Sequence, residues 1–131
     1  MRYVHVNVFV YWLGDDPEFG GKATKIIESI EAGEETITPA LTPWLTHVVL
    51  QALTEGYSAK ELMKRVRQLE FLKVTPLTLQ TYLAAVTNAQ EQKLDFEDAI
   101  HYSAAREHGA SEIYSNDLDF NRTPLKPVGF S

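Results

Sequence analysis

The sequence contains no cysteine, and several classes of site are thereby excluded. Disulfide frameworks, thiolate zinc sites and cysteine nucleophiles all require that residue. Basic residues are also few, because 12 lysines and arginines stand against 18 acidic residues and give a formal net charge of -6 at pH 7. Such a charge argues against a general basic nucleic-acid binder. An enzyme that acts on nucleic acid remains compatible with it, since bound metal ions can supply positive charge locally.

Long apolar runs are missing as well. No stretch approaches the ~18 consecutive apolar residues of a membrane-spanning helix. The first apolar stretch, residues 4–13, contains His5 and Asn7 and lacks the small-residue cleavage site of a signal peptide. We therefore expect a cytoplasmic protein with no membrane contact. The length of 131 residues predicts a single domain, residues 1–131, which can bury a core without disulfides.

A regular alternation of strand and helix patterns runs along the chain. Short runs of β-branched and apolar residues predict strands, which fall at residues 2–6, 35–38, 72–75, 112–115 and near 128. Capping residues before apolar residues at helical spacing predict helices, which begin near Asp16, Thr42, Ser58 and Asp95, after Pro76 and, as a short one, at Asn7. This order predicts an α/β domain with a mostly parallel sheet and helices on both faces.

Three acidic residues in the last third of the sequence lie beside predicted helix and strand ends. Asp98 lies in the first turn of the helix that Asp95 caps, and Asp117 and Asp119 follow the strand at 112–115. Ligands of parallel sheets bind at the carboxyl ends of the strands, so these three acids are candidates to converge there and to hold a hard cation such as Mg²⁺. Each acid also has a structural interpretation. Asp98 can stabilise a helix N-terminus, and the other two can form a turn.

Three stretches of the sequence resemble the PIN domain family, and within it the VapC-type toxins. Residues 3–10 (YVHVNVFV) resemble the opening strand, and residues 94–101 (LDFEDAIH) resemble the third motif, with Asp98 at its acidic position. Residues 114–120 (YSNDLDF) resemble the fourth motif, with Asp117 at the main acid and Asp119 at the accessory one. The resemblance implies a PIN-like three-layer fold, with a roughly five-stranded sheet between helices.

The same resemblance implies a function. Family members are mostly Mg²⁺- or Mn²⁺-dependent endoribonucleases that hydrolyse RNA phosphodiesters, often form homodimers and are neutralised by an antitoxin protein. Asn7 and Ser115 would support the site in this chain. No membrane partner is implied.

Two of the four acidic positions of the family hold other residues here. His5 stands where the first strand normally ends in an acid, and Leu45 stands at the glutamate of the second motif. Neutral imidazole suits transition metals such as Zn²⁺ or Mn²⁺ better than Mg²⁺. We therefore expect one of two arrangements. Either His5 binds a transition metal together with Asp98 and Asp117, or it is a cation whose pKa those carboxylates raise.

Leu45 offers no ligand and is expected to pack. Apolar residues at helical spacing predict the buried face of its helix, made by Leu45, Val48, Val49 and Ala52. The remaining histidines, His47, His101 and His108, have no metal-binding spacing and are expected at the surface or in packing positions.

Two functions stay open at this point. The first is a metal-dependent endoribonuclease toxin, weakened by His5 and Leu45, in which Asp98, Asp117, Asp119 and His5 are catalytic. The second is a catalytically degenerate PIN domain that binds an antitoxin or RNA. A phosphoacceptor receiver domain fits less well, because the strand at 72–75 ends in a threonine and a proline rather than in an aspartate.

Overall fold

A five-stranded parallel sheet forms the centre of the structure, a computed structural model that describes all residues from Met1 to Ser131. The strands are β1 (Arg2–Val4), β2 (Thr36–Pro39), β3 (Leu72–Thr75), β4 (Glu112–Tyr114) and β5 (Lys126–Val128). Their order in the sheet is β3–β2–β1–β4–β5, and every neighbouring pair is parallel. The predicted α/β fold with a parallel sheet is confirmed.

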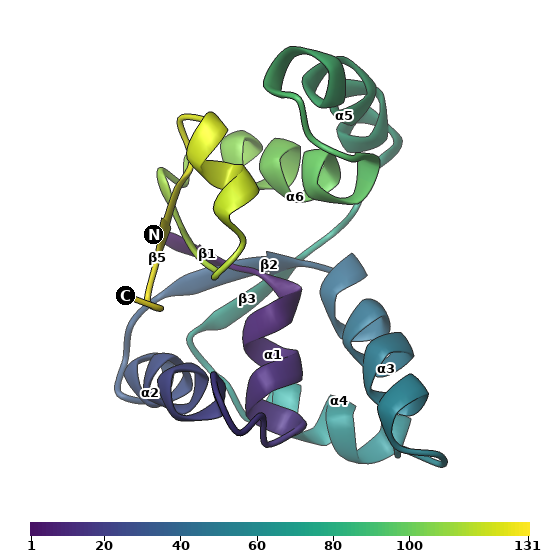
Figure 1. Ribbon diagram of the computed structural model, residues 1–131, viewed down its shortest axis with the longest axis vertical. Helices are drawn as coiled ribbons and strands as arrows, with labels where there is room; N and C mark the ends of the chain where they lie inside the picture. The colour runs from purple at the N-terminus through teal and green to yellow at the C-terminus, as the bar shows by residue number, and fades with distance from the viewer.

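Helices cover both faces of the sheet. They are α1 (Val6–Leu13), α2 (Gly20–Glu31), α3 (Leu41–Leu53), α4 (Ala59–Arg67), α5 (Leu79–Gln92), α6 (Phe96–Glu107) and the 3₁₀ helix η1 (Leu118–Arg122). Figure 1 shows α1 to α4 on one side of the sheet and α5, α6 and η1 on the other. None of these helices is both long and apolar enough to cross a bilayer.

Each face of the sheet has its own hydrophobic core. Because successive strand residues point to opposite faces, the neighbours Tyr3 and Val4 belong to different cores. Tyr3 packs in the core beneath α6 and η1, which includes Phe120. Val4 packs in the core beneath α1 and α2, which includes Phe9. Strand β1 therefore separates the two cores and contributes a residue to each.

The first strand is shorter than the sequence pattern predicts. The strand expected over residues 2–6 ends at Val4, and α1 begins at Val6, so the short helix expected from Asn7 is present. His5 is the residue between them, in extended conformation at the N-cap of α1. Its carbonyl accepts a hydrogen bond from the Val8 amide at 3.1 Å. The apolar run predicted a longer strand because a buried helix has the same composition as a buried strand.

The start of α2 also differs from the prediction. Asp16 caps a turn rather than the helix itself, since its Oδ1 accepts hydrogen bonds from the backbone amides of Glu18 and Phe19. The helix begins only at Gly20. An aspartate followed by proline fits a turn as well as a helix start, so the local signal was ambiguous.

The predicted buried face of α3 is wrong. The buried residues are Thr42, Thr46 and Leu50, whereas Leu45 is only partly buried and Ala52 is exposed. The two threonines tolerate burial because their hydroxyls have partners. Thr42 Oγ1 accepts from Thr38 Oγ1, and Thr46 Oγ1 donates to the Thr42 carbonyl, each at 2.7 Å.

Helix α5 packs mainly on α6 and lies away from the sheet, as Figure 1 shows. Its buried residues are Thr81 and Ala85. The apolar residues that predicted the helix, Leu79, Leu83 and Val86, are instead exposed, with Leu79 72% accessible. They form an apolar stripe on the outer surface, called here the α5 stripe.

Candidate metal centre

The candidate site lies where the strand order of the sheet reverses. From β1 the chain proceeds outward through β2 and β3, and it then returns to place β4 and β5 on the opposite side. Connections from the central strands β1 and β4 therefore lead away from each other at their carboxyl ends, which opens a crevice. The His5 amide donates to the Tyr114 carbonyl at 3.1 Å, and this bond fixes the start of both connections.

Three side chains from distant parts of the sequence meet in this crevice. One ligand atom from each of His5, Asp98 and Asp117 lies within 4.8 Å of the others. His5 Nε2 is 3.7 Å from Asp98 Oδ1. His5 and Asp98 are buried, and Asp117 is partly buried. The structure thus brings together a nitrogen donor and two carboxylates.

Local capping bonds hold the two carboxylates in place. Asp95 caps α6 by accepting the Asp98 amide at 2.8 Å, which fixes the first turn that carries Asp98. Asp117 is the N-cap of η1 and accepts the Asp119 amide at 2.9 Å. Both acids therefore stand at the starts of helices, where the helix dipole favours negative charge.

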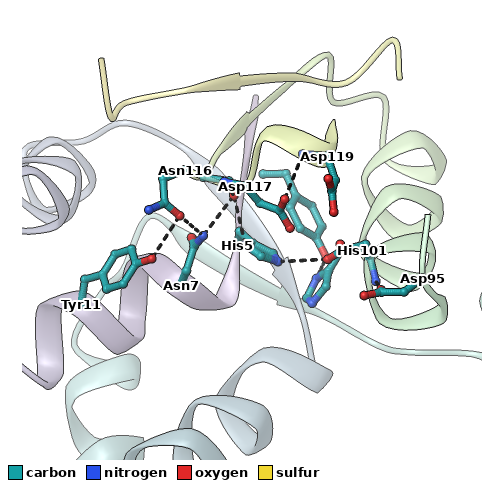
Figure 2. A network of polar contacts seen from close by, with 11 residues as sticks. His5, Asn7, Tyr11, Asp95, His101, Asn116, Asp117 and Asp119 are labelled. Carbon is teal, nitrogen blue, oxygen red and sulfur yellow. Dashed lines mark hydrogen bonds and ion pairs between the residues drawn. The ribbon is translucent and has the colours of Figure 1, made fainter. Parts of the chain in front are cut away.

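Ser115 orients the imidazole of His5 through the ring nitrogen that lies away from Asp98. Ser115 Oγ is hydrogen-bonded to His5 Nδ1 at 3.1 Å, so Nε2 is the nitrogen that faces Asp98. Figure 2 shows His5 between Asn7 and His101. The Ser115 hydroxyl also accepts from Asn7 Nδ2 at 3.2 Å and from the Asp117 amide at 3.0 Å. Metal-binding histidines commonly have their second nitrogen held in this way. Asn7 and Ser115 thus occupy supporting positions.

A second histidine lies against the first, which sequence reasoning missed. His101 is completely buried and contacts the His5 ring edge to face at 4.8 Å between centroids. Its Nδ1 is hydrogen-bonded to the Tyr3 hydroxyl at 2.7 Å, and its Nε2 has no partner. It is a packing residue, as expected, but it packs on the site. The signal was available, since Asp98 and His101 are three positions apart in the sequence, a spacing that places both on one helix face.

Burial opposes a positive charge on His5. Desolvation lowers the pKa of His5 to about 4, although the charges of Asp117 and Asp95 act in the opposite direction. Of the two arrangements expected for His5, the cationic one is therefore disfavoured, because desolvation outweighs the carboxylates that raise its pKa. Burial, followed by the charges of Asp117 and Asp95, raises the pKa of Asp98 to about 8. Both pKa shifts favour a neutral imidazole and a protonated carboxyl group over an ion pair between His5 and Asp98.

The donor set fits a transition metal better than magnesium. Imidazole nitrogen with two carboxylates suits Mn²⁺ or Zn²⁺, whereas Mg²⁺ prefers oxygen ligands alone. Asp98 would release its proton when a divalent cation binds. The two carboxylates would then neutralise the charge of that cation beside the oriented imidazole. His5, Asp98 and Asp117 are the residues that would hold such an ion.

Two residues singled out in the sequence lie outside this group. Asp119 is half exposed and forms an ion pair with Arg122 at 3.1 Å, so it is not one of the three clustered donors. Leu45 lies in the second turn of α3, partly buried, and offers no donor atom.

The sheet order, the two-sided helical cover and the acids at the strand ends are those expected of the three-layer α/β domain that the sequence motifs indicated (Figure 1). The sequence matches the profile of the PIN domain over residues 3–126. The chain therefore belongs to the PIN domain family.

Solved structures of similar fold are toxins and toxin–antitoxin complexes. VapC20 from Mycobacterium tuberculosis, described as a toxin that cleaves the sarcin–ricin loop, aligns with a TM-score of 0.80 at 18% identity and 98% coverage of both chains. A toxin–antitoxin complex from Klebsiella pneumoniae aligns with a TM-score of 0.67 at 18% identity, and the alignment covers 96% of this chain and 99% of the other. VapBC2 from Rickettsia felis, bound to promoter DNA, aligns with a TM-score of 0.72 at 14% identity, and the alignment covers 100% of both chains. No curated protein sequence matches this chain significantly.

Proposed function

We propose that this chain is a metal-dependent endoribonuclease of the VapC toxin type. Its activity would be lower than that of a family member with all four acidic residues in the site. The observation that carries the proposal is the convergence of His5, Asp98 and Asp117 at the reversal point of the sheet. A similar fold belongs to VapC20, which is described as a toxin that cleaves the sarcin–ricin loop. RNA is a polyanion, and an acidic crevice can accept its backbone only when a cation neutralises the carboxylates.

Each residue of the site has a distinct role in this proposal. A divalent ion bound there would supply charge that polarises a phosphoryl oxygen and acidifies water. Asp98 and Asp117 would hold that ion, and His5 would provide the nitrogen donor. Ser115 keeps the His5 ring in its orientation, with Asn7 bonded to the same hydroxyl. His101 and Phe120 pack against the His5 ring and exclude water from its inner edge.

The proposal predicts cleavage that depends on Mn²⁺ more than on Mg²⁺. We expect a labelled single-stranded RNA to be cleaved slowly with Mn²⁺, more slowly with Mg²⁺ and not at all with a chelator. Asp117→Asn should lower the Mn²⁺-dependent rate by roughly 100-fold, since it removes a ligand. Asp119→Asn is the matched control and should lower it by about tenfold at most. Equal loss in both variants would contradict the assignment of the clustered donors.

A second candidate function is a degenerate PIN domain that binds an antitoxin or RNA without cleaving. The raised pKa of Asp98 and the absence of a donor at Leu45 favour it, because both reduce the negative charge that gathers a cation. Under this hypothesis, no metal restores cleavage by the unmodified chain.

Restoring the two acids separates the alternatives. We expect His5→Asp combined with Leu45→Glu to increase Mg²⁺ affinity by tenfold or more in titration calorimetry, since hard oxygen ligands replace imidazole and leucine. The single variant Leu45→Gln serves as a control that adds a polar group without charge. If the double variant binds Mg²⁺ no better than the original chain, Leu45 does not stand at the acidic position of the family.

We also propose an antitoxin protein as partner and a homodimer as the assembly. The solved structures of similar fold include a toxin–antitoxin complex and VapBC2 bound to promoter DNA. The α5 stripe, with three exposed apolar side chains on one helix, is the surface that we assign to the dimer contact.

A further inference from the structure

A pocket opens directly beside the candidate metal centre. Its volume is about 350 Å³, within the usual range for small-ligand sites. It begins at Ser115 and Asn116, the two residues before Asp117, and extends under the C-terminal segment. Its remaining lining residues are Phe19, Leu118, Asn121 and residues 127–131.

One wall of the pocket is aromatic. Phe19 and Phe130 both line it, with ring centroids 6.2 Å apart, and Tyr11 packs on each of them at 5.0 and 5.8 Å. The segment that carries Phe130 is held closely against the body of the protein. Gly129 has a φ of +97°, and a Cβ there would lie 2.8 Å from the Tyr114 ring. The wall is therefore fixed by a close backbone approach that only glycine allows.

Two amide side chains, Asn116 and Asn121, also line the pocket. The Oδ1 atom of Asn116 accepts two hydrogen bonds, from Asn7 Nδ2 at 2.6 Å and from the Tyr11 hydroxyl at 3.1 Å. Both of its lone pairs are thereby used, and Nδ2 remains as a donor. Figure 2 shows that nitrogen on the side of Asn116 away from Asn7. Asn121, from η1, adds a second amide at the rim.

We propose that this pocket binds one base of a single-stranded RNA whose adjacent phosphate lies at the metal centre. The inference rests on the proposed nuclease function. Planar bases stack on aromatic rings whatever their sequence, and the Asn116 donor can bond an acceptor atom on the base edge. An apolar peptide side chain would satisfy the rings but leave that donor without a partner. The hydrogen bonds of Ser115 and Asn7 connect the pocket to His5, so base and phosphate would be positioned together.

The test measures base binding apart from cleavage. Uridine, the four nucleoside 5′-monophosphates and inorganic phosphate are titrated into the chain with a chelator present, and affinities are read from NMR chemical-shift changes. We expect uridine and at least one nucleotide to bind saturably, with shifts at Asn116, Asn121 and Phe130. Phe130→Ala should weaken this binding about fivefold or more, the usual effect of losing one stacking partner. Leu53→Ala, on the exposed surface of α3, is the matched control and should not change it.

The outcomes distinguish this inference from the proposed nuclease. No saturable binding of any base, or equal binding by Phe130→Ala, would overturn the base pocket even if the chain cleaves RNA. Binding of inorganic phosphate with the same shifts as uridine would also overturn it, because the pocket would then recognise charge rather than a base. Asn121→Ala provides a second variant should Phe130→Ala unfold, and it should weaken uridine binding by twofold or more. Base binding without metal-dependent cleavage would uphold the pocket and contradict the nuclease.

Discussion

The carboxyl group of Asp98 connects the chemistry of the site to the stability of the protein. Its pKa is raised to about 8 from an ordinary value of 3.8, so the folded chain holds a proton that the unfolded chain releases. The folded state therefore loses stability as the pH rises toward 8. His5 acts in the opposite sense below its ordinary pKa of 6.5, because burial keeps its folded form neutral. His101, whose pKa burial also lowers, acts in the same sense as His5. Above pH 6.5 most of the contribution of both histidines is complete, so Asp98 dominates the pH dependence between pH 6.5 and 8.

We predict that Asp98→Asn removes this pH dependence. With a chelator present, the original chain should lose about 1–2 kcal/mol between pH 6.5 and 8, and the variant should lose much less. Thermal unfolding followed by circular dichroism across this range measures the difference. Parallel curves for the two proteins would show that Asp98 titrates normally in the folded state. Added Mn²⁺ should raise the melting temperature of the original chain more at pH 8 than at pH 6.5, since it binds the ionised carboxylate.

At the scale of the element, the start of α6 has two functions at once. Asp95 caps the helix, and its charge is also one of the causes that raise the pKa of Asp98. Cap and charge can be separated, because asparagine caps a helix as well as aspartate but carries no charge.

We expect Asp95→Ala to destabilise the protein by about 1 kcal/mol and Asp95→Asn to leave its stability nearly unchanged. Urea unfolding near pH 6 measures both. The two variants should lower the pKa of Asp98 alike, as followed by NMR, since each removes the same negative charge. A stability loss shared by Asp95→Asn would indicate that the charge, rather than the cap, stabilises α6.

Elements that depend on local chemistry could be predicted from the sequence. The Asp95 cap, the Ser58 cap and the strand at Leu72–Thr75 appear as expected, because each signal lies within a few neighbouring residues. The buried face of α3 could not be predicted in this way. Thr42 is buried because its hydroxyl meets Thr38 in the preceding strand, and only the folded chain supplies that partner.

The candidate site shows the same division. Motifs indicated Asp98, Asp117 and His5, which the structure brings together, but they also suggested Asp119, which instead pairs with Arg122. The charge of His5 was judged from its neighbours in the site. Its pKa is decided by desolvation, a property of the whole packed crevice that a linear sequence does not contain.

At the scale of the whole molecule, the α5 stripe is the feature that bears on assembly. Leu79, Leu83 and Val86 are exposed on a helix that carries no charged residue before Glu91. A symmetric dimer juxtaposes the same surface from both subunits, so a charge-free apolar face is self-complementary even in a protein of net charge -6.

We predict that the chain sediments as a dimer and that Leu83→Glu converts it to a monomer by placing two like charges in the contact. Leu53→Glu, at a leucine on α3 that is more exposed than Leu83 (72% against 57%), is the matched control and should remain dimeric. Analytical ultracentrifugation over a concentration series distinguishes the two. A monomeric original chain, or dissociation by both variants, would contradict the assignment of the α5 stripe.

The position of β1 between the two cores limits how this chain can vary in length. A one-residue insertion before Tyr3 that shifted the strand would exchange Tyr3 and Val4 between the cores and carry His5 away from Ser115 and Asp98. Packing and site would then fail together. Length changes in the exposed residues 54–56, which precede the contact of Tyr57 with the core beneath α1 and α2, would leave both intact. Natural variation in length should therefore be concentrated in those residues and absent from the first five residues.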